Sequence, residues 1–107
     1  MRKFTTGATR DVDDEKLDYE GFLSPLVIRR YAEYMHKCRK QADGQLRGSD
    51  NWKSGMPRKV YVKSLWRHFW DVWYDPTNDE AICGALFNLM GLLHELLLGR
   101  NIEEDEE

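Results

Sequence analysis

The chain has 107 residues, of which 41% are hydrophobic and 33% are charged, a balance typical of one small globular domain. The formal net charge is −3, but the last five residues, EEDEE, are all acidic, so residues 1–102 are mildly basic. This weak positive charge suits a small anionic ligand and excludes the strongly basic surface with which proteins bind long nucleic acids.

The first segment, residues 1–23, shows no sustained hydrophobic period, and we expect a long ordered arm without a convincing strand. Ser24 is a favourable N-cap residue, and Pro25 suits the first position of a helix. Apolar residues then recur at helical spacing until the pattern ends near Arg39. The sequence therefore predicts a first helix over about residues 25–40.

Residues 41–56 form a long connection, and loops of this length in compact domains are usually functional or disordered. Within it lies the stretch SDNWKSG, and Trp52 argues against simple disorder. This indole either fixes the loop against the helices or offers a flat face to a ligand. A second helix is predicted from Pro57 to just before Pro76, with apolar side chains repeating along one face.

The third helix is predicted to begin after the stretch TNDE, where Thr77 and Glu80 have the spacing of a capping box. It ends near Leu98, because Gly99 is suited to the position after a helix. The helix is apolar almost all round, which predicts burial by the rest of the chain or by a second copy in a homo-oligomer.

These elements predict an all-α fold: a small bundle of three main helices in one domain, residues 1–102, followed by a disordered acidic tail, residues 103–107. No apolar run is expected to span a bilayer, and the opening MRKFTTGATRD lacks the apolar segment of a secretory signal. Cys38 and Cys83 show no metal-site spacing, so we expect reduced thiols in a cytoplasmic protein.

A line of small and polar residues runs down the otherwise apolar third helix: Ala81, Gly84, Asn88, Gly91 and Glu95. Small residues allow a second helix or a flat ligand to approach closely. One interpretation is close helix packing, with Asn88 fixing the register as buried amides do in coiled coils. The other is the wall of a binding site, in which the amide of Asn88 forms hydrogen bonds to a ligand.

Candidate catalytic residues are His68 and Asp71, which share a face of the second helix, together with Glu80 and Glu95. They could hold a divalent metal, or His68 and Asp71 could simply form a local hydrogen bond. The spacing matches neither the helical magnesium pyrophosphohydrolases nor the histidine–aspartate phosphohydrolases. Because Mg²⁺ requires several oxygen ligands in strict geometry, the sequence does not supply a complete catalytic set.

The arm and the loop contain the groups that bind a phosphate and stack on a base. We predict that cationic and aromatic groups from both segments converge beside the polar line of the third helix. The candidate ligand-binding residues are Arg10, Tyr19, Trp52, Lys53, Ser54, Arg67, His68 and Asn88. Arginine and lysine would hold phosphates, Trp52 and Tyr19 would stack, and His68 and Asn88 would donate or accept hydrogen bonds.

Several strings, in order, resemble a family of small, largely phage-encoded proteins, the dATP/dGTP diphosphohydrolase N-terminal domain. They are GATRDVDDEKLDYEGFLSPLVIRRYAEYMHKCR, SDNWKSG, YVKSLWRHFWDVW and FNLMGLLHE, and the resemblance covers about residues 5–97. It implies a purine nucleotide as ligand and the cytoplasm of an infected bacterium as the setting. A phage could use such a protein to sequester a nucleotide signal of bacterial immunity, and capture would need no cofactor.

Two other functions remain open at this point. The first is a metal-dependent dATP/dGTP diphosphohydrolase, which would use Mg²⁺ with the four catalytic candidates. The second is a helical adaptor that binds a host protein through its aromatic surface and needs no cationic pocket.

Overall fold

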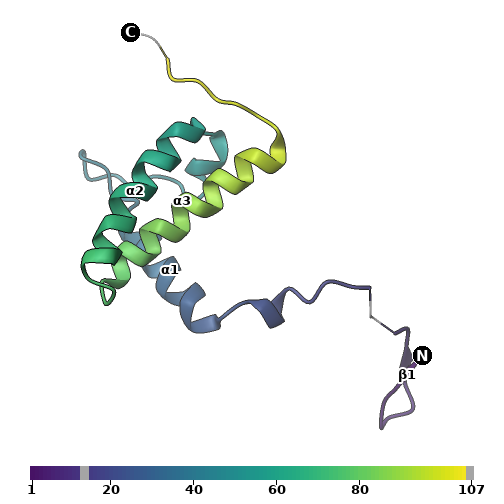
Figure 1. Cartoon of the computed structure of the whole chain (residues 1–107). Helices are drawn as coiled ribbons and strands as arrows, with labels where there is room; N and C mark the ends of the chain where they lie inside the picture. Colours follow the sequence, from purple (N-terminus) through teal and green to yellow (C-terminus); the bar gives the residue numbers. More distant parts are fainter. Residues whose placement is uncertain (13–14, 106–107) are drawn as a thin grey trace.

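The computed structural model describes residues 1–12 and 15–105, in which three helices follow an extended arm (Figure 1). The helices are α1, Pro25–Lys37, α2, Arg58–Tyr74, and α3, Asp79–Leu98. The prediction of a mostly helical chain with three main helices is confirmed. Residues 103–105 of the acidic tail are exposed, whereas Glu106 and Glu107 lie outside the described residues.

The arm carries a small antiparallel hairpin, in which β1, Arg2–Lys3, pairs with β2, Thr9–Arg10. Gly7 supports the turn with a φ of 90°, a conformation that glycine adopts without steric cost. The expectation that the chain has no strand is therefore wrong, because two-residue strands are too short to produce an alternating pattern. The arm continues through a short 3₁₀ turn, η1, Glu20–Phe22, and extends away from the helices (Figure 1).

The start of α1 is the one that the sequence predicts. Ser24 Oγ accepts a hydrogen bond from the amide of Val27 at 3.3 Å, and a proline occupies the first turn. The helix ends at Lys37 rather than near residue 40, because the chain folds back on itself directly afterwards. The amide of Arg47 donates to the carbonyl of Arg39 at 2.8 Å, and the Nε of Arg39 donates to the carbonyl of Arg47 at 2.7 Å.

The N-cap of α3 is Asn78 and not Thr77. The side-chain oxygen of Asn78 accepts a hydrogen bond from the amide of Ala81 at 3.1 Å, whereas the hydroxyl of Thr77 donates to Asp75 at 2.6 Å. Glu80 does not reach back to cap the helix, so the predicted capping box is not formed. The other end follows the prediction, with Gly99 in the left-handed conformation at a φ of 70°.

Helices α2 and α3 form an antiparallel hairpin that is the centre of the structure (Figure 1). Two glycines of α3 receive aromatic rings of α2. A Cβ atom on Gly91 would lie 2.5 Å from Cζ of Tyr61, and a Cβ atom on Gly84 would lie 2.5 Å from Nδ1 of His68. The glycines of this line therefore form a packing surface between the two helices, as the first of the two interpretations proposed, whereas the side chain of Asn88 donates within α3, to the carbonyl of Gly84.

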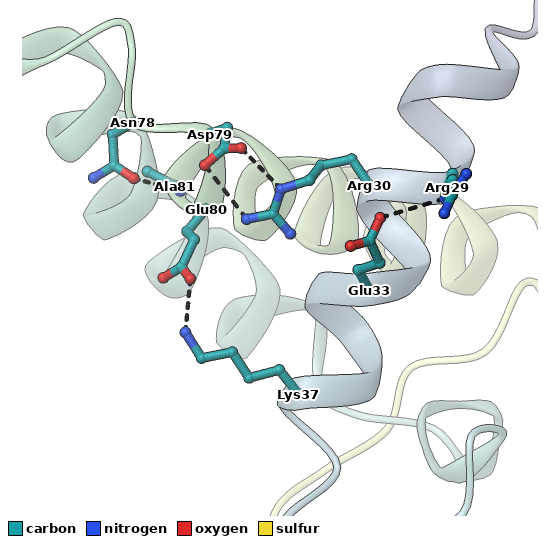
Figure 2. Close-up of polar contacts among 8 residues, drawn as sticks. All are labelled: Arg29, Arg30, Glu33, Lys37, Asn78, Asp79, Glu80 and Ala81. Carbon is teal, nitrogen blue, oxygen red and sulfur yellow. Dashed lines mark hydrogen bonds and ion pairs between the residues drawn. The ribbon is translucent and has the colours of Figure 1, made fainter.

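Helix α1 is joined to the first turn of α3 by two ion pairs (Figure 2). Arg30 Nε lies 2.8 Å from Asp79 Oδ2, and Lys37 Nζ lies 2.6 Å from Glu80 Oε1. All four side chains are at least partly exposed, and exposed pairs contribute little free energy. The two ion pairs instead position α1, because they place its C-terminal end beside the α2–α3 hairpin.

The large apolar side chains of α3 are not buried by the rest of the chain, which is one of the two ways of burial that the sequence predicts, and burial by a second copy stays a prediction. The residues of α3 buried in the structure belong instead to the small and polar side, such as Gly84, Asn88 and Gly91. Among the described residues, α3 is the one helix whose length and composition would allow it to cross a membrane, with a mean hydropathy of 1.7 over its window. The expectation that no segment meets this criterion is therefore corrected, although core helices of globular proteins also meet it.

Candidate functional site

A pocket of about 510 Å³ lies on the side of the α2–α3 hairpin that faces α1 and the long loop. Its walls come from the last turns of α1 with the residues that follow, from the loop after Leu46, and from α2 and α3. The contributions of α2 and α3 are Ser64, His68, Gly84, Phe87 and Asn88. This volume lies within the range of about 300–1,000 Å³ that small-molecule sites occupy.

Among the residues that the structure describes, the charged groups that line the pocket are basic. Arg39, Arg47, His36 and His68 contribute to the lining, and no aspartate or glutamate of the described residues does. Neither arginine forms an ion pair with an acidic residue in the part of the chain that the structure describes. A concave surface with charge of one sign concentrates ligands of the opposite charge, so this pocket is suited to an anion.

Arg39 is held in place by a backbone carbonyl and by a ring nitrogen of His36. Its Nε donates to the carbonyl of Arg47 at 2.7 Å, and its Nη1 lies 3.3 Å from Nδ1 of His36. Because these contacts use no carboxylate, the charge of the guanidinium is not neutralised by any residue that the structure describes. The side chain is half-buried and therefore less screened by water than a surface arginine would be.

The remaining walls are apolar or aromatic. Trp52 and Phe87 offer rings, and Met35 and Met56 offer flexible thioethers. Tyr34 also lines the pocket, and burial raises the pKa of its phenol to about 12. This phenol is protonated at neutral pH, as an ordinary tyrosine is, and Cys38 lies within hydrogen-bond reach of it.

Trp52 belongs to a short 3₁₀ turn, η2, Asn51–Ser54, that is anchored to the C-terminal end of α3. The rings of Trp52 and His94 meet edge to face, with centroids 4.9 Å apart. The carbonyl of Lys53 accepts a hydrogen bond from Nη2 of Arg100 at 2.9 Å. Trp52 thus fixes the loop, as one of the two interpretations expected, and it also lines the pocket, whereas the stacking of its ring on a ligand stays a prediction.

Glu95 is fully buried and serves this anchor. Its carboxylate receives Nε of Arg100 at 2.5 Å and Nη2 of Arg100 at 2.8 Å, a bidentate pair. The hydrogen bond from Arg100 holds the pKa of Glu95 below its ordinary value, and this effect outweighs the loss of solvation. Glu95 is therefore ionised and neutralised by Arg100, and it does not line the pocket.

Replacing Glu95 with glutamine should lower the stability of the protein most at neutral pH. A carboxylate with a depressed pKa stabilises the folded state above its unfolded pKa, ordinarily 4.5, and loses this contribution as pH falls through the folded value. Urea unfolding of wild type and Glu95→Gln at several pH values should show a difference that shrinks below pH 4.5. Glu104→Gln, on the exposed tail, is the control, and a difference independent of pH would contradict the assignment.

The structure brings three of the predicted ligand-binding residues into this pocket: Trp52, His68 and Asn88. The side-chain nitrogen of Asn88 donates to the carbonyl of Gly84 at 2.7 Å, which fixes the amide on the floor of the pocket. Lys53 and Ser54 belong to η2 but are exposed and do not line the pocket. Arg67 is exposed on α2 and is likewise absent from the lining.

The predicted convergence of the arm with the loop does not occur within the single chain. Arg10 lies in the β1–β2 hairpin, and Tyr19 is 74% exposed just before η1. The arm leads away from the helices, and neither residue lines the pocket (Figure 1). The physical reason is that the loop is fixed to α3 by Arg100 and His94, whereas Arg10 and Tyr19 have no comparable contact among the described residues.

The catalytic candidates are not brought together either. Asp71 is exposed on α2, Glu80 pairs with Lys37, Glu95 pairs with Arg100, and His68 alone lines the pocket. Within the described ranges, no group of three histidine, cysteine, aspartate or glutamate side chains is arranged to hold a metal ion. The described part of the chain thus offers no assembled acid–base or metal centre.

Comparison with family models, curated proteins and solved structures finds no match for this chain. The resemblance to the dATP/dGTP diphosphohydrolase N-terminal domain therefore stays a prediction, and we infer the function from the geometry of the pocket.

Sequence reasoning missed Arg39, Arg47 and Tyr34 as pocket residues. A signal for the two arginines was present, because they flank a segment with Gly44, which turns the chain at a φ of 85°. A hairpin with this centre brings residues 39 and 47 side by side, as the bridge between Lys40 and Leu46 shows. Tyr34 had no such signal, because helical spacing alone does not distinguish a core tyrosine from a pocket tyrosine.

Proposed function

We propose that the pocket binds a phosphate-bearing purine nucleotide and holds it without cleaving it. The observation that carries this proposal is the lining itself, in which two arginines and two histidines face one cavity without a described carboxylate. The basic groups would disfavour a cationic ligand, and a magnesium-dependent reaction would need acidic ligands, which the described residues do not contribute to the lining.

The chemical groups of a nucleotide correspond to groups of the pocket. The guanidinium groups of Arg39 and Arg47 suit phosphate oxygens, because arginine can donate two parallel hydrogen bonds. The ring of Trp52 can stack on a base, an interaction that contributes about 1–3 kcal/mol where bases stack on aromatic side chains. His68 and Asn88 lie on the α2 and α3 side of the same cavity, where they can select the edge of the base.

The positions of the acidic residues favour capture over hydrolysis. Glu80 and Glu95 are each engaged by a basic side chain, and Asp71 lies on the exposed side of α2. A protein that binds a nucleotide without turnover acts by lowering its free concentration. This is the mode of action expected of a phage protein that sequesters a nucleotide signal.

The proposal is tested by incubating the protein with dATP, dGTP, ATP and a cyclic purine dinucleotide, each with and without Mg²⁺. After ultrafiltration, the filtrate is analysed by chromatography, and the retained protein is then heated to release its ligand. We expect at least one purine nucleotide to be depleted from the filtrate and recovered unchanged after heating, independently of Mg²⁺.

Two results would contradict the proposal in different ways. Release of pyrophosphate or phosphate in the presence of Mg²⁺ would identify a diphosphohydrolase instead. Filtrates with undiminished nucleotide in every condition would exclude nucleotide capture. UTP serves as the matched control, since it carries the same phosphates on a single-ring base.

A further inference from the structure

Helix α3 carries a regular stripe of large apolar side chains on its exposed side. Ile82, Leu86, Leu89, Leu93 and Leu96 recur at alternating steps of four and three, the spacing of a coiled-coil core. These five side chains are between 38% and 55% exposed. A helix that buries its small and polar side and exposes a heptad stripe of leucines lacks a partner for that stripe.

Helix α2 exposes a matching stripe at the same spacing, formed by Val62, Trp66, Phe69 and Trp73, which are 39% to 68% exposed. Tyr61 and His68 pack on α3, and the exposed positions 62 and 69 each follow them by one residue, a rotation of about 100°. In α3 the exposed residues 82, 89 and 96 likewise follow the buried residues 81, 88 and 95 by one position. Because the two helices are antiparallel, equal rotations place both stripes on the same side of the hairpin.

We call these nine residues the apolar face: Val62, Trp66, Phe69, Trp73, Ile82, Leu86, Leu89, Leu93 and Leu96. The pocket lies on the other side of the hairpin, where it is lined by Ser64, His68 and Phe87. The apolar face is therefore separate from the site described above, and an occupant of one does not obstruct the other.

The surface area of the chain indicates how much of it lacks a partner. The accessible surface is 9258 Å² for a mass of 12.7 kDa. A compact monomer of this mass exposes about 6,200 Å². The radius of gyration is 19.0 Å, against about 13 Å for a compact domain of this length. The excess of about 3,000 Å² for one chain, to which the extended arm also contributes, is larger than the roughly 1,000–2,500 Å² that each copy of an obligate homodimer buries, half of the total for the pair.

We propose that a second copy of this chain covers the apolar face, so that two α2–α3 hairpins form a four-helix bundle. A two-helix layer with heptad stripes on one side is half of such a bundle, and a twofold axis lets the same stripe serve both copies. The aromatic and leucine side chains supply the desolvated centre that homodimer interfaces require. The arms and the pockets lie outside the paired faces.

A second copy fits this face better than a lipid bilayer does. The exposed side of α2 that carries Trp70 also carries Lys63 and Arg67. If the apolar face were inserted into a bilayer, these two charges would lie at the edge of the hydrocarbon region. In a four-helix bundle the same charges lie at the rim, in water. Insertion into a bilayer would also not explain the heptad spacing, because lipid requires only that the side chains are apolar and does not require them to repeat at a fixed interval.

The test is sedimentation velocity of the full chain over a hundredfold range of concentration. We expect a dimer that dissociates only at the lowest concentrations, and a shift of tryptophan emission to longer wavelength on dissociation. Leu89→Glu, at the centre of the stripe, should produce a monomer at every concentration. Leu26→Glu, which places the same charge on an 82% exposed leucine of α1, should leave the dimer intact.

A second variant guards against simple unfolding of Leu89→Glu. In a Cys38→Ser background, Leu93→Cys should form a disulfide-linked dimer on mild oxidation, because the stripe lies close to its symmetry mate, whereas Leu26→Cys should not. A monomeric wild type at all concentrations would overturn the proposal. Binding of a monomer to phosphatidylcholine vesicles would overturn it as well, since the face would then be a membrane surface.

Discussion

Gly91→Ala should destabilise the protein by more than about 2 kcal/mol, although alanine is the better helix former by about 1 kcal/mol. The new Cβ atom would stand 2.5 Å from Cζ and 2.8 Å from the hydroxyl oxygen of Tyr61. Tyr61 is only 1% exposed, so its ring is packed inside the protein and cannot simply swing out into solvent. The clash must then separate α2 from α3, and urea unfolding followed by circular dichroism would measure the loss.

A double mutant distinguishes this clash from any other effect at position 91. In a Tyr61→Ala background the space beside Gly91 is open, and Gly91→Ala should become neutral or stabilising by up to about 1 kcal/mol. The sign of the Gly91 substitution therefore reverses with the residue at position 61. A Gly91→Ala protein as stable as wild type would show that the two helices do not pack as described.

Arg47→Glu should weaken nucleotide binding by at least about tenfold, because a charge-assisted hydrogen bond contributes about 1.5–3 kcal/mol and the new carboxylate repels phosphate. Arg47 is suited to this test since the structure assigns its carbonyl and amide, rather than its guanidinium, to the loop hairpin. Isothermal titration calorimetry with the nucleotide found by the retention experiment would measure the change. The loss should be smaller at high salt, where charges are screened.

The matched control for Arg47→Glu is Arg10→Glu, which makes the same change of charge on the arm. We expect its affinity to remain near that of wild type, because the arm does not reach the pocket (Figure 1). Equal losses in both variants would mean that overall charge, and not a contact in the pocket, attracts the ligand. Loss in Arg10→Glu alone would restore the site predicted from sequence.

Local signals in the sequence predicted the helices well. Ser24 caps α1 through its hydroxyl, and Gly99 ends α3 in the left-handed conformation, because both effects depend only on neighbouring residues. The capping residue of α3 was misplaced by one position, since Thr77 and Asn78 are both suitable caps. The hydrogen bond from Thr77 to Asp75, which decides between them, is not visible in a capping pattern.

Tertiary arrangement was predicted less completely. The line of small and polar residues on α3 was correctly identified as distinct from the rest of the helix. Its role depended on which helix packs against it, and the rings of Tyr61 and His68 show that this helix is α2. Trp52, His68 and Asn88 were identified by residue type and do line the pocket. The contributions of the arm were misjudged, because sequence gives the composition of a segment but not the direction in which it leaves the domain.

The exposed side of α3 shows the same limit in another form. Hydrophobicity predicted that the large side chains would be buried, and in the single chain they are not. The apolar composition indicates that Leu89 and its neighbours require a partner. It does not indicate whether that partner is another part of the same molecule or a second molecule. The heptad spacing and the surface area add the information that favours a second copy.

The central claim, that the pocket between α1, the loop and the α2–α3 hairpin binds the nucleotide, is tested most directly by nuclear magnetic resonance. Amide resonances of the chain are assigned, and dATP is added to saturation. The largest shifts should fall on the loop around Ser49 and Trp52 and on His68 and Asn88, with the β1–β2 hairpin unchanged. Shifts concentrated on the arm or on the apolar face, or no shifts with any purine nucleotide, would contradict the claim.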